Sequence, residues 1–92
     1  MSFNVLVHGD VLKGLSQLDS STRSRILAAI RQLRENPSIS KPGSDIRKLR
    51  VPEGRTPLYR MRVGEYRVIF AVEGTTVLVT ELVHRSQAYR SL

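Results

Sequence analysis

The chain has 92 residues, a length that suits one domain, residues 1–92, built around a single core. Its 15 Lys and Arg outnumber its 8 Asp and Glu, and twelve of the basic residues are arginine, whose planar guanidinium binds phosphate in bidentate fashion. The formal net charge of +7 therefore favours a polyanionic partner such as nucleic acid. The absence of cysteine excludes disulfides and thiolate chemistry, and no apolar run approaches the roughly 18 residues of a membrane helix. We expect a cytoplasmic protein with no membrane partner.

The N-terminal third predicts a strand followed by a helical hairpin. Phe3–Val7 is rich in β-forming residues and is expected to be the first strand. Asp10 is the expected N-cap of a short helix, and Asp19 or Ser20 opens a longer one that ends at Asn36-Pro37. Apolar residues recur at helical spacing in both segments, at Val11, Leu12, Leu15 and Leu18 and at Ile26, Leu27, Ile30 and Leu33.

The segment 37–57 is predicted to be a long loop, because it is rich in Pro, Gly and Ser and shows no clean periodicity. Loops of this length are uncommon in compact domains and are often functional. This loop is also basic, with Lys41, Arg47, Lys48, Arg50 and Arg55. Its middle is expected to be anchored to the core by Ile46, Leu49 and Val51.

The C-terminal half predicts an antiparallel meander of three strands, Leu58–Val63, Tyr66–Phe70 and Val77–Val83. The two turns between them contain Gly64-Glu65 and the segment 73–76. The face toward the helices is expected to carry Met61, Val63, Val68, Phe70, Val72, Val77 and Val79. The predicted fold class is therefore α+β, with a twisted antiparallel sheet packed against two helices.

The first hairpin of this meander is predicted to gather three arginines on one face. A two-residue turn with glycine first favours type II′ geometry, which pairs Val63 with Tyr66 and places Arg62 opposite Arg67. Arg60 shares that face because side chains alternate along a strand. At about 6 Å two such charges repel by roughly 0.7 kcal/mol in water and about 3 kcal/mol at an effective dielectric near 20. An arrangement of this kind suits a phosphate ligand.

The remaining motifs favour a basic site that uses neither metal nor cofactor. His8 and His84 stand far apart, the acids are scattered, and there is no glycine-rich phosphate loop. RNA carries its own nucleophile, the 2′-hydroxyl, so its cleavage needs charge stabilisation and proton transfer. Arginine supplies the first but does not deprotonate in proteins. The proton-transferring group must come from elsewhere, and His84 and Tyr89 are the candidates.

Several stretches together resemble a known family. These are Lys48-Leu49 in the basic loop, LYRMRVGEYRVIF over Leu58–Phe70 and VHRSQAY over Val83–Tyr89. This pattern resembles the RelE side of the RelE/ParE superfamily of toxins from toxin–antitoxin pairs, over almost the whole chain. The resemblance implies a ribosome-dependent endoribonuclease that cuts messenger RNA and is silenced by a cognate antitoxin. The implied partners are therefore the antitoxin, the ribosome and messenger RNA.

The resemblance also implies roles for individual residues. Arg60 and Arg62 match two basic residues that are often lysines in the family, and Arg67 matches its phosphate-stabilising arginine. Arg85 matches a second such arginine, and Tyr89 a tyrosine that stacks on the substrate base and assists catalysis. Contacts with RNA or the ribosome are expected from Arg47, Lys48, Arg50, Arg55, His84 and Arg90.

Two other functions fit the same sequence. A ParE-like protein would inhibit a topoisomerase such as gyrase through a helical surface and would perform no chemistry. A non-catalytic RNA-binding module would use the positive charge alone. Loss of activity on changing Arg67 or Tyr89 distinguishes the nuclease from both, since neither of the other functions requires those two side chains.

Overall fold

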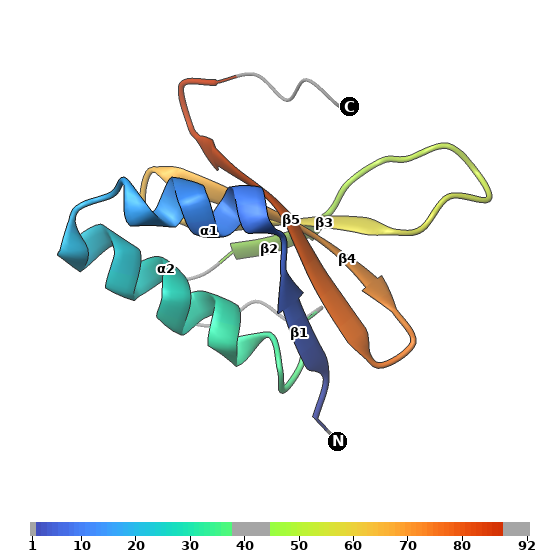
Figure 1. Ribbon diagram of the computed structural model, residues 1–92. Helices are drawn as coiled ribbons and strands as arrows, with labels where there is room; N and C mark the ends of the chain where they lie inside the picture. Colours follow the sequence, from blue (N-terminus) through green and yellow to red (C-terminus); the bar gives the residue numbers. More distant parts are fainter. Residues whose placement is uncertain (1, 38–44, 88–92) are drawn as a thin grey trace.

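The protein folds into a five-stranded sheet with two helices on one face (Figure 1). The computed structural model describes residues 2–37 and 45–87. The elements in chain order are β1 (Asn4–Val7), α1 (Gly9–Ser16), α2 (Ser20–Gln32), β2 (Asp45–Lys48), β3 (Leu58–Val63), β4 (Tyr66–Glu73) and β5 (Thr76–His84). The strand order is β1-β5-β4-β3-β2. The predicted α+β fold and its meander are confirmed.

Both helices begin at a side chain that caps their free backbone N–H groups. The predicted cap at Asp10 is wrong, because the helix starts earlier: His8 is the N-cap of α1 and its Nδ1 accepts from the Asp10 N–H at 3.0 Å. Asp19 caps α2 as predicted, and accepts from the backbone N–H and the hydroxyl of Thr22 at 3.0 and 2.7 Å. The second helix ends at Gln32, before the predicted stop at Asn36-Pro37.

The two hairpins of the meander turn at glycine. Gly64 and Gly74 both have a φ of 57°, and no non-glycine residue in the described ranges has a positive φ. A positive φ at the first turn position alone is the pattern of a type II′ turn, which matches the twist of antiparallel strands. The predicted pairing of Val63 with Tyr66 and of Arg62 with Arg67 is confirmed.

The strand β1 departs from the predicted antiparallel sheet, because it pairs with β5 in parallel. The chain leaves β1 through the helices, enters the sheet at the opposite edge with β2, and returns through three antiparallel steps to β5. Such a crossover is how parallel neighbours are connected. The sheet is therefore mixed, with one parallel pair and three antiparallel ones.

The predicted loop over residues 37–57 contains a strand, β2, so this part of the prediction is wrong. Its four residues pair antiparallel with β3, from Asp45 opposite Arg62 to Lys48 opposite Tyr59. A strand this short and this charged has little propensity of its own, and pairing with a neighbour decides its conformation. The segment after β2 projects from the end of the sheet before the chain returns into β3 (Figure 1).

A β-bulge interrupts the pairing of β4 with β5. Ile69 lies opposite Glu81 and Phe70 lies opposite Val79, so Thr80 is an extra residue in β5. The Thr80 hydroxyl donates to the Ile69 carbonyl at 3.3 Å. Beyond the bulge, Arg67 pairs with Val83 and Tyr66 with His84.

The core lies between the helices and one face of the sheet. Its fully buried side chains include Phe70 and Val68 from β4 and Ile26 from α2, each 0% exposed. The seven core residues predicted in the meander all belong to it, six buried and Val72 partly buried against the others. On this face the Tyr59 ring stacks on Phe70, with centroids 5.4 Å apart. Within residues 2–37 and 45–87 the opposite face carries no helix, and it positions the candidate site.

Candidate functional site

Three arginines lie on the sheet face opposite the helices, as predicted. Arg62 and Arg67 are direct cross-strand partners, and Arg60 lies two residues from Arg62 along β3. Directly opposite residues on one face have Cβ atoms about 5 Å apart. The exposures differ: Arg62 is exposed, Arg67 is partly buried with its Nε covered, and the Arg60 side chain is only 11% exposed. The predicted outward orientation is thus correct for the side of the sheet, while Arg60 is largely covered.

The strand β2 adds a fourth arginine and a carboxylate to this face. Arg47 pairs with Arg60 and Asp45 pairs with Arg62. We call Arg47, Arg60, Arg62 and Arg67 the arginine face. Asp45 forms two ion pairs there, with Arg47 Nε at 3.6 Å and with Arg60 Nη2 at 3.7 Å. One negative charge therefore offsets part of the repulsion among four positive ones.

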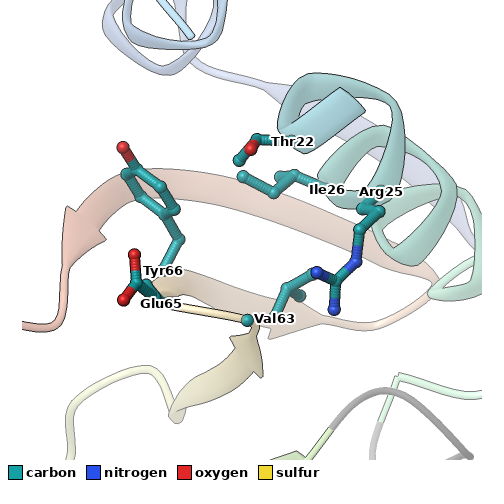
Figure 2. A pocket seen from close by; sticks show the side chains of 7 residues that line it. Thr22, Arg25, Ile26, Val63, Glu65 and Tyr66 are labelled. Carbon is teal, nitrogen blue, oxygen red and sulfur yellow. The ribbon is translucent and has the colours of Figure 1, made fainter. Parts of the chain in front are cut away.

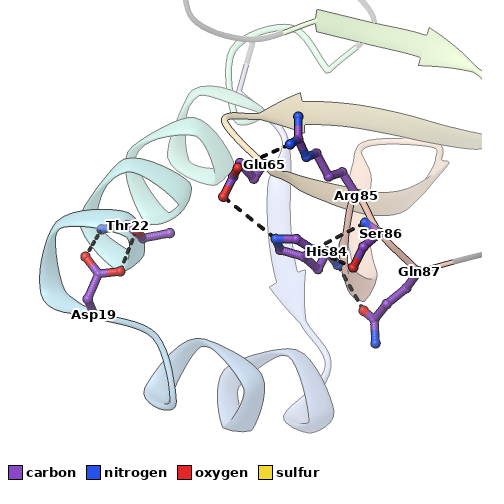
Figure 3. A network of polar contacts seen from close by, with 7 residues as sticks. All are labelled: Asp19, Thr22, Glu65, His84, Arg85, Ser86 and Gln87. Carbon is purple, nitrogen blue, oxygen red and sulfur yellow. Dashed lines mark hydrogen bonds and ion pairs between the residues drawn. The ribbon is translucent and has the colours of Figure 1, made fainter.

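The end of β5 forms a polar cluster beside the first hairpin turn. Figure 3 shows Glu65 of that turn between His84 and Arg85. Its carboxylate lies 3.8 Å from His84 Nε2 and 3.7 Å from Arg85 Nη2, and its carbonyl accepts the Arg85 N–H at 2.7 Å. Because β5 is the neighbour of β4, Arg85 lies at the same end of the sheet as Arg67.

His84 lies on the other side of the sheet from the arginine face. It pairs with Tyr66, which precedes Arg67 and therefore points to the helix side, and the two rings meet edge to face at 5.1 Å. Its Nδ1 contacts the Ser86 hydroxyl at 2.8 Å. The described structure thus separates one candidate proton-transferring residue from the three hairpin arginines.

A pocket of about 260 Å³ lies on the helix side of the same hairpin (Figure 2). Thr22, Ile26 and Arg25 line it from α2, and Val63 and Tyr66 line it from the sheet. The Arg25 guanidinium reaches the turn, where a Cβ on Gly64 would lie 3.4 Å from its Nη1. The sheet separates this pocket from the arginine face.

The other predicted contact residues do not converge on one point. Lys48 pairs with Tyr59 and so points to the helix side, away from Arg47. Arg50 and Arg55 are exposed in the segment between β2 and β3. Lys41 of the basic loop lies outside the described residues, as do Tyr89 and Arg90, so the roles predicted for Tyr89 and Arg90 stay predictions.

Asp45 was not predicted, because it lies in the segment read as a loop. A signal was present in the alternation of Asp45, Ile46 and Arg47, in which one apolar residue stands between two charged ones. Within residues 2–37 and 45–87, no group of three or more His, Asp or Glu side chains is placed to hold a metal ion. No helix in those ranges is long and apolar enough to span a membrane.

Comparison with known proteins assigns the family. Residues 5–89 match the model of the ParE toxin of type II toxin–antitoxin systems. The putative toxin RelE1 of Methanocaldococcus jannaschii is 33% identical over 93 residues, which covers 99% of both chains. The archaeal RelE–RelB complex from Pyrococcus horikoshii superposes with a TM-score of 0.81 at 31% identity, over 96% of this chain and all of that one. A chain of a RelB–RelE complex from Methanococcus jannaschii superposes with a TM-score of 0.68 at 28% identity, over 88% of this chain and 91% of the matched chain. With 99% of its length matched in sequence and 96% in fold, the chain belongs to the RelE/ParE superfamily of toxins from type II toxin–antitoxin systems.

Proposed function

We propose that this toxin is a RelE-like endoribonuclease that cleaves messenger RNA on the ribosome through the 2′-hydroxyl of the RNA. The observation that carries the proposal is the pairing of Arg62 with Arg67, which concentrates positive charge with Arg60 on the sheet face opposite α1 and α2. Guanidinium groups in that arrangement suit the charge that develops on a phosphate during cleavage.

The arginines act on the phosphate and not on the protons. Arg67 and Arg62 stabilise the pentacoordinate phosphorus from two adjacent strands, while Arg60, which is largely covered, forms an ion pair with Asp45. Tyr89 is proposed to stack on the substrate base and to assist proton transfer, and Arg85 to contact the phosphate from the end of β5. The ribosome orients the message, and orientation alone can contribute several kcal/mol.

A cognate antitoxin is the protein partner that membership in this family implies. Two solved relatives are complexes of RelE with RelB, which supports the same pairing here. We propose that exposed basic residues on both sides of β2, among them Arg47, Lys48, Arg50 and Arg55, contact an acidic segment of that antitoxin. The same residues are available to ribosomal RNA when the antitoxin is absent.

Cleavage of a translated message in a reconstituted system tests the function. Arg67→Ala removes one donor to the transition state, so the rate of cleavage mapped by primer extension should fall about 10²-fold or more. Arg31→Ala, which removes an exposed arginine of α2, is the matched control and should cleave at the wild-type rate. Equal cleavage by wild type and Arg67→Ala, or none by wild type, would contradict the proposal.

The match to the ParE family model favours a second candidate, inhibition of a topoisomerase without catalysis. A supercoiling assay with purified gyrase separates the two. The nuclease leaves supercoiling intact, and a ParE-like inhibitor blocks it while translation continues. The Arg67→Ala variant would retain such an inhibitory activity.

A further inference from the structure

The arginine face needs a proton acceptor that its arginines cannot provide. Arginine stays protonated in proteins, so none of the four can accept the proton of a 2′-hydroxyl. His84 lies on the opposite side of the sheet. The only described residue of β2 or β3 that combines a carboxylate with a place on this face is Asp45.

The geometry of Asp45 places its carboxylate among the residues that bind phosphate. It lies directly across from Arg62, and its two oxygens contact different arginines, Oδ1 that of Arg47 and Oδ2 that of Arg60. These contacts hold the carboxylate beside Arg62, one of the two arginines proposed to bind the phosphate. The side chain is nonetheless 41% exposed, so a substrate can reach it.

We propose that Asp45 is the general base of the cleavage reaction, an inference that rests on the nuclease function proposed above. The 2′-hydroxyl belongs to the ribose directly attached to the scissile phosphate, and a phosphate bound by Arg62 with its ribose toward β2 brings that hydroxyl beside Asp45. Asp45 accepts the hydroxyl proton, the freed 2′-oxygen forms a bond to phosphorus, and the bond from phosphorus to the 5′-oxygen breaks. The leaving oxygen takes a proton from solvent water, and the hydroxide that remains takes the proton held by Asp45. The products are a 2′,3′-cyclic phosphate and a 5′-hydroxyl end.

One other acid of the described sheet shares this face near the arginines, and it is less well placed. Glu81 of β5 lies opposite Ile69, on the far side of β4 from Arg60 and Arg62. Asp45 is adjacent to both of those arginines through β2–β3 pairing. The competing assignment gives a direct comparison, because the two carboxylates can be neutralised one at a time.

Single-turnover cleavage on programmed ribosomes, measured at increasing toxin concentration, tests the assignment. Asp45→Asn should lower the maximal rate by about 10² to 10⁴-fold, the range expected for loss of a general base. The half-saturating concentration should stay the same or fall, since a negative charge leaves a surface that binds RNA. Asp45→Glu should recover part of the rate, and the products should carry a 2′,3′-cyclic phosphate. Glu81→Gln and the exposed-acid control Asp10→Asn should cleave at close to the wild-type rate.

A purely structural role for Asp45 predicts a different pattern. If the carboxylate only offsets charge, Asp45→Asn should lower the melting temperature and bind RNA more tightly while cleaving at the wild-type rate. That result, or a loss of cleavage in Glu81→Gln in place of Asp45→Asn, would overturn the assignment. Failure of the wild-type protein to cleave would instead refute the nuclease function itself, so the wild-type measurement separates these two failures.

Discussion

At Gly64 the first hairpin turn depends on one residue type. The backbone there has a φ of 57°, a region that residues with a Cβ enter at a cost of roughly 1–2 kcal/mol. An added Cβ would also lie 3.4 Å from the Arg25 guanidinium. The turn in turn fixes the register that places Arg62 opposite Arg67. The glycine therefore supports the candidate site without touching it.

We expect Gly64→Ala to lower the free energy of unfolding by about 1 kcal/mol or more, because alanine is strained at positive φ. Urea denaturation followed by circular dichroism measures this change. Gly9→Ala is the matched control, since Gly9 lies in α1 without a positive φ and a Cβ there meets no atom within 4 Å. An equal effect of both substitutions would show that the turn conformation carries no special cost.

Individual positions differ in how far the sequence predicts them. Arg60, Arg62 and Arg67 were predictable as a set, because a glycine-first turn and strand alternation fix their register with local information alone. The sequence does not predict on which side of the sheet His84 lies, because that side depends on the bulge at Thr80 and no local pattern marks the bulge. Asp45 was missed because its strand exists only through pairing with β3.

At the scale of elements, α2 shows that a local sequence signal can be enough to predict where a helix begins. Asp19 accepts hydrogen bonds from the hydroxyl and the backbone N–H of Thr22. Both bonds lower the pKa of the Asp19 carboxyl, and the hydroxyl has the larger effect. A cap of this kind is visible in the sequence as an acid before a helical stripe. The strand β2 shows the opposite case, since four residues without a clean apolar pattern become regular only beside a formed neighbour.

We expect Asp19→Ala to lower the melting temperature by several degrees at neutral pH, because α2 loses its N-cap. The folded-state pKa of Asp19 is depressed, so its contribution is present above the unfolded-state pKa and is lost as pH falls through the folded-state pKa. The difference between wild type and variant should therefore shrink in acid. Melting curves across that range check this, with the exposed Ser24→Ala as control. A difference that does not change with pH would contradict the ionised cap.

The whole molecule has two layers, and the two faces of its sheet differ in character. The helices and the apolar side of the sheet supply the core, and the opposite side presents the arginine face. The net charge of +7 adds a long-range attraction for polyanions to this local arrangement. Composition alone predicted the attraction, while the position of the proposed binding surface required the topology of the sheet.

We expect binding to single-stranded RNA to weaken with salt, with a slope of about −0.7 in log–log form for each phosphate contacted. Arg62→Gln should reduce the magnitude of that slope by about 0.7, because Arg62 is the exposed one of the two arginines in β3. Fluorescence anisotropy with a short labelled RNA measures both slopes. Arg31→Gln removes the same charge from α2 and should leave the slope nearly unchanged.

The single additional residue at Thr80 reverses the sidedness of the rest of its strand. Val77 and Val79 point toward the helices before it, whereas after it Glu81 and Val83 face the opposite way. Uninterrupted pairing would bury Glu81 among apolar side chains and bring His84 round beside Arg67. The titratable group that accompanies Arg67 is thus set by whether the pairing of β5 accommodates Thr80 as a bulge, and removal of this one threonine would leave Glu81 opposite Ile69 and His84 opposite Tyr66.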